Sequence, residues 1–405
     1  MSSHDAAPNR PHLPIYLDYQ ATTPVDPRVL QAMLPYFAEK FGNPGSVSHS
    51  FGREASLAVE NAREQVAALI GAEAREIVFT SGATESNNLA IKGAARFRGE
   101  TRRHIVTLAT EHKCVLESAK AMEAEGFRVT YLPVERDGLV DLGRLAAALD
   151  EDTVLVSVMA AHNEIGVIQP LAEIGALCRA RGIYFHTDAA QAVGKIALDV
   201  EALGIDLMSI SGHKIYGPKG VGALYVRRRP RVRLEPLLSG GGQERGLRSG
   251  TLAAPLIVGF GEACAIAGVE MAEEGKRLLA LRQRLADGLM ARVPELRING
   301  DLAQRLPGNL NVSIPGVDAE ALMAALPELA LSSGSACTSA EVEPSYVLRA
   351  LGLPEALARA SLRIGLGRFT EADEVDYAAQ AIAEAARRLR ALGGRALPAG
   401  AKAAG

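Results

Sequence analysis

The sequence predicts an α/β protein with a large, mainly parallel, seven-stranded sheet and a smaller α+β domain. From about residue 76, seven short runs rich in β-branched residues alternate with amphipathic stretches, as in strands joined by crossover helices. Beyond about residue 270, a charged amphipathic helix and separated strands follow. Single cores stop growing near ~250–300 residues, so we expect a large domain at 22–270 and a small one at 1–21 and 271–405.

Each predicted strand of the large sheet is a short apolar run. The segment at 170–182 starts with proline and ends at glycine with apolar residues at helical spacing, which predicts a crossover helix. In chain order the strands are EIVFT (76–80), HIVTLAT (104–110), FRVTYLPV (127–134), TVLVSVMA (153–160), GIYFHTDAA (182–190), IDLMSIS (205–211) and GALYVRR (222–228).

The small domain is predicted from a helix over residues 273–293 and strands at 310–314 and 361–367. The tail from about residue 391 is rich in Ala and Gly and has no large apolar side chains to anchor it. We therefore expect this tail to be mobile.

Composition favours small-molecule chemistry. Hydrophobic residues make up 48% and charged residues 22%, as in globular proteins, and the charge balance of 44 − 47 = −3 favours neither nucleic acid nor an anionic membrane. An apolar signal core is missing at the N-terminus and no apolar run approaches the ~20 residues that span a bilayer, so a cytoplasmic protein is expected. The four cysteines are scattered, which predicts neither a disulfide framework nor a structural zinc site.

Three segments carry polar residues directly after predicted strands. In FTSGATESNNLAIKG a strand ends at Phe79 and a helix follows, whose free N–H groups could bind a phosphate with help from the Thr84 hydroxyl. Asp188 ends a strand where α/β sheets place ligands, and it could pair with a protonated pyridine nitrogen while Gln191 reaches the ring hydroxyl. The alternatives are an ordinary capping turn and a helix N-cap, respectively.

The third segment, SGHKIYGPKG (211–220), places Lys214 in a glycine-bounded loop beside two further phosphate donors, Ser211 and His213. Schiff-base chemistry needs one amine whose pKa is lowered by desolvation or nearby positive charge. A solvated lysine is the alternative, but three parts of one cofactor site in plausible chain order favour pyridoxal phosphate.

With these residues the chain resembles pyridoxal-phosphate enzymes of aminotransferase-like fold (fold type I), and among them the cysteine desulfurases of the iron-sulfur-cluster (IscS) type. The resemblance spans nearly everything except the two ends. The matching blocks are PIYLDYQATTPVDPRV, GNPGSVSHSFGREA, FTSGATESNNLAIKGAA, TEHKCVLE, HNEIGV, FHTDAAQAVGK, SGHKIYGPKG, GGGQERGLRSGT, LSSGSACTSAEVEPSYVLRALG and SLRIGLGRFT.

The resemblance implies a role for each matching position. Lys214 would form the Schiff base, with His112 stacked on the ring and moving protons, and Arg363 would bind the substrate carboxylate. A structural ion pair is the alternative for Arg363, and a hydrogen-bonded structural residue for His112. The implied cofactor contacts are Ala83, Thr84, His112, Asn163, Asp188, Gln191, Ser211, His213 and Lys214, with Thr251 from the neighbouring subunit of a homodimer; Asn163 would also contact substrate.

Cys337 lies in SSGSACTSAEVEPS, a run of small and hydroxylic residues that predicts an exposed flexible loop. Cys178 and Cys264 lie in apolar surroundings and are predicted to be core residues, whereas Cys114 near His112 has no such loop. The resemblance implies that the Cys337 thiolate takes sulfur from L-cysteine as a persulfide, leaving L-alanine. No resident metal is expected, although Cys337 could transiently bind a cluster.

The implied sulfur acceptors are an iron-sulfur scaffold protein and proteins of tRNA or cofactor thiolation. The chain departs from the cluster-assembly members at its end, LPAGAKAAG (397–405), where they have a longer docking segment. Another pyridoxal-phosphate lyase or aminotransferase, such as a selenocysteine lyase, is the alternative enzyme. A non-catalytic sulfur-assembly partner is the alternative from another class.

Overall fold

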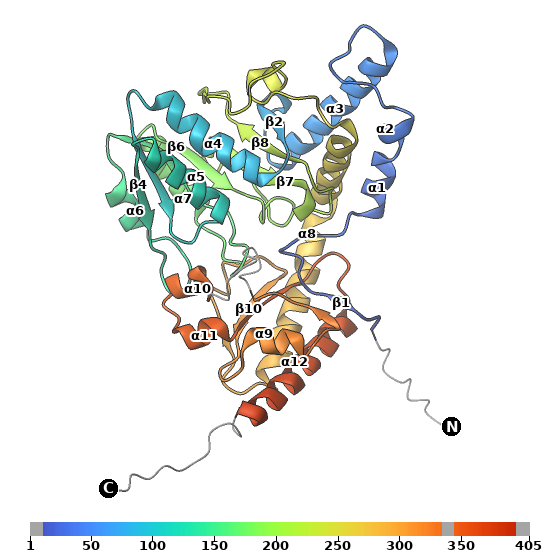
Figure 1. Cartoon of the computed structure of the whole chain (residues 1–405), viewed down its shortest axis with the longest axis vertical. Helices are drawn as coiled ribbons and strands as arrows, with labels where there is room; N and C mark the ends of the chain where they lie inside the picture. The colour runs from blue at the N-terminus through green and yellow to red at the C-terminus, as the bar shows by residue number, and fades with distance from the viewer. Residues whose placement is uncertain (1–10, 334–343, 394–405) are drawn as a thin grey trace. The chain divides into compact units, whose positions relative to one another are not determined.

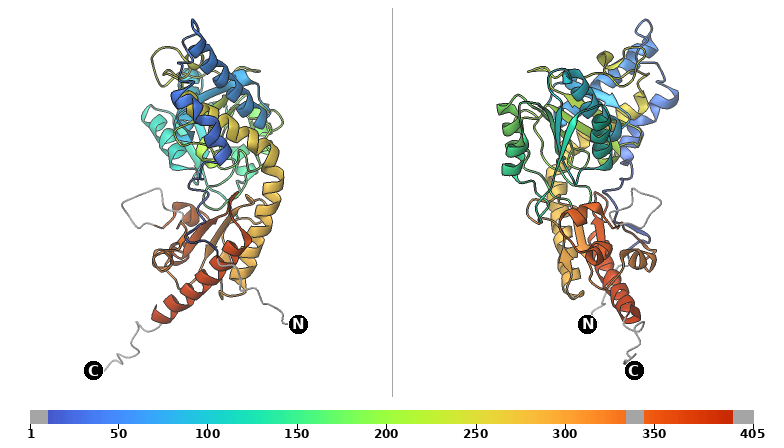
Figure 2. Two further views of the ribbon diagram at one scale, coloured as in Figure 1. Left: turned by 90° about the vertical axis from the view of Figure 1, so that its right-hand side faces the viewer. Right: turned by 60° about the vertical axis from the view of Figure 1, so that its left-hand side comes forward.

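The computed structural model describes residues 11–333 and 344–393, which form two compact units (Figure 1). The large unit consists of residues 20–275 and 301–306. The small unit consists of the described residues of 1–19, 276–300 and 307–405. Helix α8 (Ala254–Met290) begins in the large unit and ends in the small unit as one continuous helix (Figure 2).

The large unit contains a seven-stranded sheet in the order β2-β8-β7-β6-β5-β3-β4. β8 runs antiparallel to its neighbours β2 and β7, and the other pairs are parallel. The predicted mainly parallel sheet of seven strands is therefore confirmed, and each predicted run contains one strand. Their bounds are β2 Ile77–Thr80, β3 His104–Leu108, β4 Arg128–Leu132, β5 Thr153–Ser157, β6 Tyr184–Asp188, β7 Leu207–Ser211 and β8 Gly222–Val226.

Helices α4 (Ala83–Arg98) and α5 (Lys113–Ala124) pack on this sheet through one apolar cluster. Leu89, Ile91 and Val115 of these helices are at most 1% exposed, and burial of such side chains contributes about 1.5–3 kcal/mol each. The remaining helices of the large unit are α1 Pro27–Met33, α2 Pro35–Ala38, α3 Ser50–Leu69, α6 Leu142–Ala148, α7 Leu171–Ala180 and the 3₁₀ turns η1 Ala74–Glu76, η2 Gly212–Lys214 and η3 Glu244–Gly246.

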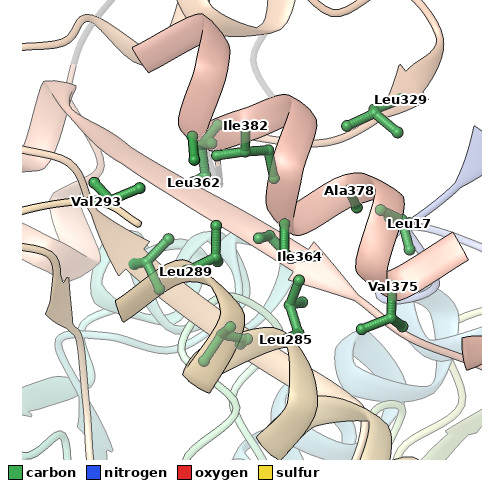
Figure 3. Close-up of a cluster of buried hydrophobic side chains, with 14 of the residues drawn as sticks. Leu17, Leu285, Leu289, Val293, Leu329, Leu362, Ile364, Val375, Ala378 and Ile382 are labelled. Carbon is green, nitrogen blue, oxygen red and sulfur yellow. The ribbon is translucent and has the colours of Figure 1, made fainter. Parts of the chain in front are cut away.

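The small unit has its own core, made by α8, α12 (Ala372–Gly393) and a three-stranded antiparallel sheet in the order β12-β10-β9. Leu285, Leu289, Leu362, Ile364 and Ile382 meet there, and each is fully buried (Figure 3). The other elements are β1 Ile15–Tyr16, parallel to β11 Leu329–Ala330, with β9 Arg297–Ile298, β10 Asn309–Ser313, β12 Ser361–Gly365, α9 Ala319–Ala324, α10 Tyr346–Ala350 and α11 Glu355–Arg359.

The predicted strands at 310–314 and 361–367 are present as β10 and β12, and the crossover helix at 170–182 as α7. The helix predicted over 273–293 is instead the second half of α8, which starts at Ala254. By length and composition helix α8 could cross a membrane, a criterion that core helices of soluble proteins also meet, and half of its most apolar window is buried. α12 extends to Gly393, and residues 394–405 of the predicted tail lie outside the described residues.

Candidate active site

The candidate site is built on the carboxyl ends of neighbouring strands in the large unit. β6 ends at Asp188, β7 ends at Ser211, and short connections lead from β2 into α4 and from β3 into α5. Ligand sites of open α/β sheets lie at this edge, because the loops that follow parallel strands all emerge there. The fold therefore gathers most of the predicted site residues at one edge of one sheet.

The first part of the site is the start of α4, whose N-cap is Gly82 with φ 146°. Among the described residues, no side chain caps this helix, so its first N–H groups are available to an anion. A Cβ on Gly82 would lie 3.9 Å from Ser211 Oγ, which places this hydroxyl beside the helix start. A Cβ on Gly222 would lie only 2.7 Å from the Gly82 Cα, so the close approach of β8 to this turn requires glycine.

His213 lies in the turn after β7 and contacts the Thr22 hydroxyl through Nδ1 at 3.0 Å. Burial lowers the pKa of His213 to about 4, and the positive charge of Lys214 acts in the same direction. The imidazole is therefore neutral at pH 7, and it can offer a hydrogen bond but not a charge to an anion.

The Lys214 amine donates hydrogen bonds to the backbone carbonyls of Gln20 at 2.6 Å and Ala21 at 2.7 Å. Gln191 Nε2 donates to the same Gln20 carbonyl at 2.9 Å, and Lys195 donates to Gln191 Oε1 at 3.1 Å. Lys214 and Gln191, predicted from separate motifs, thus meet at one carbonyl. These contacts hold the half-buried Lys214 amine against the backbone, which favours a positioned amine over a solvated loop charge.

Asp188 is the carboxylate at the centre of the site and is 7% exposed. Its Oδ1 accepts the N–H of Ala190 at 3.0 Å, and its Oδ2 accepts Nδ2 of Asn87, on α4, at 2.7 Å. The alternative role of Asp188 as a helix N-cap required a helix directly after it, but the structure has a turn there. The carboxylate therefore serves neither as a helix N-cap nor as a partner in any ion pair among the described residues.

His112 is the N-cap of α5, and its Nδ1 accepts the backbone N–H of Cys114 at 3.2 Å. The Cys114 sulfur lies 3.0 Å from the same nitrogen and 3.0 Å from Asn87 Nδ2. His112 and Asp188 are therefore linked by two intervening side chains, a contact that the sequence did not predict.

Two further buried titratable groups lie next to this constellation. The carboxyl of Glu111 accepts the Met159 N–H at 2.7 Å; burial raises its pKa well above the usual range, and nearby Asp188 acts in the same direction. His186 lies two residues before Asp188 on β6, and burial lowers its pKa to about 3. His186 is therefore neutral at pH 7, and burial disfavours a second negative charge on Glu111 beside Asp188.

The remaining predicted residues are placed as follows. Ala83 is the first residue of α4, and Thr84 follows it with an exposed side chain. Asn163 lies half-buried in the loop between β5 and α7, and Thr251 is exposed just before α8. The structure describes one copy of the chain, so the contact of Thr251 with a second subunit stays a prediction.

Two predicted residues belong to other parts of the chain. Arg363, on β12 of the small unit, is 4% exposed and donates from Nη2 to Asp18 Oδ1 at 2.7 Å. This is the ion pair named as its structural alternative, so its role toward substrate stays a prediction. Cys337 and its loop lie outside the described residues. Cys178 and Cys264 are buried core residues as predicted, and Cys114 is half-buried.

Sequence reasoning missed Asn87, Glu111 and the carbonyls of Gln20 and Ala21. The carbonyls carry no sequence signal, because any residue would provide them. Asn87 did carry a sequence signal, because it is a polar residue near the start of a predicted helix and is followed by the apolar residues Leu89, Ala90 and Ile91. Among the described residues, no cluster of three His, Cys, Asp or Glu could hold a metal ion.

Comparison with known proteins agrees with this fold. Residues 15–378 match the family model described as aminotransferase class-V. A cysteine desulfurase of Mus musculus is 61% identical over 377 residues, covering 93% of this chain and 82% of that protein. A cysteine desulfurase IscS of Rickettsia felis is 59% identical over 384 residues, covering 95% of this chain and 94% of that protein.

Solved structures share the fold over nearly their full length. A NifS-like protein matches with a TM-score of 0.86 and 41% identity, covering 92% of this chain and 99% of that one. A structure described as SspA in complex with cysteine matches with a TM-score of 0.78 and 40% identity, covering 88% and 99%, respectively.

The chain belongs to the aminotransferase class-V family, a family of pyridoxal-phosphate enzymes. The identity to named relatives extends over almost the whole chain. Within the family, the chain accordingly belongs to the cysteine desulfurases of the IscS type.

Proposed function

We propose that this protein is a pyridoxal-phosphate-dependent cysteine desulfurase that converts L-cysteine to L-alanine and transfers the sulfur to Cys337. The observation that carries the proposal is the identity of 59% to 61% with named cysteine desulfurases over 93% to 95% of the chain. The SspA structure matched above is described as a complex with cysteine, which supports the same substrate.

The residues present fit pyridoxal phosphate. The uncapped start of α4 with Ala83 and Thr84, together with Ser211 and neutral His213, offers N–H and O–H donors suited to a phosphate. The Lys214 amine is the group that would hold the cofactor covalently. The ring contacts would come from His112, Asn163, Asp188 and Gln191, and Thr251 would reach the phosphate of the partner subunit in a homodimer.

When bound, the pyridoxal ring serves as an electron sink for the charge that develops at the substrate Cα. Asp188 would support this by offering its carboxylate to the ring nitrogen, and burial raises the pKa of neighbouring Glu111, which disfavours a second negative charge there. Lys214 acts through its amine, first as the covalent attachment and then as a base near Cα. His112 moves a proton at its imidazole ring.

Sulfur transfer needs one more nucleophile, for which Cys337 is the candidate. As a thiolate, Cys337 forms an S–S bond to the substrate sulfur while the substrate Cβ–S bond breaks. The thiol proton of substrate or enzyme passes to the carbon product, so L-cysteine plus the Cys337 thiol gives L-alanine plus a persulfide. This balance requires neither an external oxidant nor a reductant.

Arg363 would bind the substrate carboxylate through a guanidinium that already donates to Asp18. A planar guanidinium has five N–H donors, so a bond to Asp18 and a bond to a second carboxylate are compatible. The persulfide would then pass to an iron-sulfur scaffold protein or to acceptors of tRNA and cofactor thiolation.

The test is to incubate the holoprotein with L-cysteine, quantify L-alanine and weigh the peptide that contains Cys337. We expect alanine to form and the Cys337 peptide to gain one sulfur atom that reductant removes. Cys337→Ser should abolish both, whereas Cys264→Ala, at a buried cysteine of α8, should keep both. Alanine production by Cys337→Ser at the unchanged rate would favour a lyase without a persulfide step, and activity with L-selenocysteine alone would favour a selenocysteine lyase.

A further inference from the structure

Asn87 and Cys114 connect the two predicted ring contacts, Asp188 and His112, by consecutive short contacts. Asn87 Nδ2 lies 2.7 Å from Asp188 Oδ2 and 3.0 Å from Cys114 Sγ. Cys114 Sγ lies in turn 3.0 Å from His112 Nδ1. All four residues belong to the large unit, and α4, α5 and β6 supply them.

The direction of these hydrogen bonds follows from the groups themselves. An ionised carboxylate only accepts, so Asn87 must turn its NH₂ group toward Asp188, and its second N–H is then directed to the sulfur. This leaves Asn87 Oδ1 buried and without a partner among the described residues. An unpartnered buried oxygen is costly, so the contact with Asp188 must outweigh that cost for the amide to keep this orientation.

The contacts of Cys114 determine which nitrogen of the His112 imidazole carries the proton. Since the sulfur accepts a hydrogen bond from Asn87, its own S–H is available for His112 Nδ1. The backbone N–H of Cys114 donates to the same nitrogen. Both donors require Nδ1 to be unprotonated, which places the proton of neutral His112 on Nε2.

We propose that Asn87 and Cys114 are positioning residues that form a hydrogen-bonded bridge between Asp188 and His112, and that this bridge keeps the His112 proton on Nε2. The bridge gives His112 a defined order of action: Nε2 first donates its proton and only afterwards accepts one. The contacts of the bridge are independent of the reaction, but its importance for catalysis rests on the proposed function.

The first test measures the tautomer directly in the holoprotein with ¹⁵N-labelled histidine. The chain has 8 histidines, and His112→Gln identifies the signal of interest. In the unmodified protein we expect a protonated Nε2 and a bare, hydrogen-bonded Nδ1. Cys114→Ala should move part of the population to the other tautomer, and Cys114→Ser, which keeps an O–H donor, should restore the original shifts. Unchanged ring shifts in Cys114→Ala would overturn the proposal.

The second test probes the Asn87 end with iodoacetamide, which forms an S–C bond to a thiolate and releases iodide. In a Cys337→Ser background, peptide mass spectrometry follows alkylation of Cys114 alone. Asn87→Ala should slow it about tenfold, because the thiolate loses a hydrogen bond to an N–H donor. Asn88→Ala is the matched control, since Asn88 is the next residue and its amide donates, within the described part of the chain, only to the Thr84 carbonyl.

Equal alkylation rates in Asn87→Ala and the parent would contradict the bridge. Neither test uses alanine formation as its readout. A protein that passes both tests but does not act on L-cysteine would refute the proposed function and leave the bridge in place, and the reverse result would refute the bridge alone.

Discussion

A buried ion pair between Arg63 of α3 and Glu244 of η3 gives a sharp stability prediction. The two side chains meet through two hydrogen bonds of 2.7 and 2.8 Å and are 3% and 2% exposed. Glu244 Oε2 also accepts the Phe79 N–H at 2.7 Å, and the guanidinium lies 4.6 Å from the centre of the Phe79 ring. The pair therefore ties the 240–251 segment to α3 and to β2.

Replacement Glu244→Gln keeps an acceptor for the Phe79 N–H. It leaves the buried Arg63 charge with exposed Glu60 as its only ion-pair partner among the residues that the structure describes. Removal of one partner of a buried pair costs about 3–5 kcal/mol. Because Glu60 remains, we expect about 3 kcal/mol, a large part of the ~5–15 kcal/mol by which such proteins are stable. The double variant Arg63→Met/Glu244→Gln should recover at least about 2 kcal/mol, since no unpaired charge remains.

The assay is urea unfolding followed by far-ultraviolet circular dichroism, because the chain has no tryptophan to report by fluorescence. The matched control is the pair Arg96–Glu125, which also makes two hydrogen bonds, at 2.7 and 3.0 Å, but is 30% and 40% exposed. Its double-mutant cycle should give a coupling of about 0–1 kcal/mol. A coupling for Arg63–Glu244 no larger than that of the control would refute the reasoning.

This pair also bears on the backbone of η3. Glu244 and Arg245 are consecutive non-glycine residues with φ of 48° and 58°, a conformation that costs roughly 1–2 kcal/mol per residue. The hydrogen bonds of the Glu244 carboxylate offset that cost and hold the backbone in this turn. The 240–251 segment also carries Thr251, so if Thr251 contacts the cofactor of a second subunit as proposed, disruption of the pair should weaken cofactor retention before it unfolds the protein.

Three further outcomes are expected. Lys214→Ala should lose the visible absorption of bound cofactor and alanine formation, whereas Lys219→Ala, five residues on and exposed, should keep both. Leu362→Ala, at a fully buried position of β12, should lower the free energy of unfolding by about 2–5 kcal/mol in a denaturant titration. His186, whose pKa burial lowers to about 3, contributes stability that is complete above its unfolded pKa of about 6.5 and falls as pH drops toward 3. Between pH 7.5 and 5 this group should account for about 2 kcal/mol of lost stability, so His186→Gln should be correspondingly less sensitive to pH in urea titrations, and an equal loss in both proteins would contradict the assignment.

The sheet was predictable because its strands are buried. Central strands of a parallel sheet are covered on both faces and appear as continuous apolar runs, which alternating helices separate clearly. β5 and β7 are buried at every position. The polar residues at their carboxyl ends were predictable for the same reason, since a polar side chain directly after such a run marks the edge where ligands bind.

The continuity of α8 was not predictable from local pattern. Glycines at 259, 261 and 268 interrupt its first half and suggest a break. In the structure they mark close packing: a Cβ on Gly261 would lie 2.6 Å from the Ala62 Cα, and one on Gly259 would lie 2.4 Å from Met33 Sδ. Small residues are therefore required where α8 meets α3 and α1, and the helix continues through them.

The individual site residues were predictable, but their connections were not. Asn87 and Asp188 are 101 positions apart and meet because β2 and β6, each followed by its own connection, open onto the same edge of the sheet. A polar residue in an apolar helix indicates that it has a partner but not which one. The register of the strands decides that partner. Side chains two residues apart on a strand point to the same face, so His186 lies on the face from which Asp188 meets α4. There Ser157 and Ser209 form hydrogen bonds with the two ring nitrogens of His186. Asp188 thus accepts hydrogen bonds from Ala190 and Asn87 on its two oxygens and lies near a neutral His186, an arrangement that leaves one carboxylate available to a cationic ring.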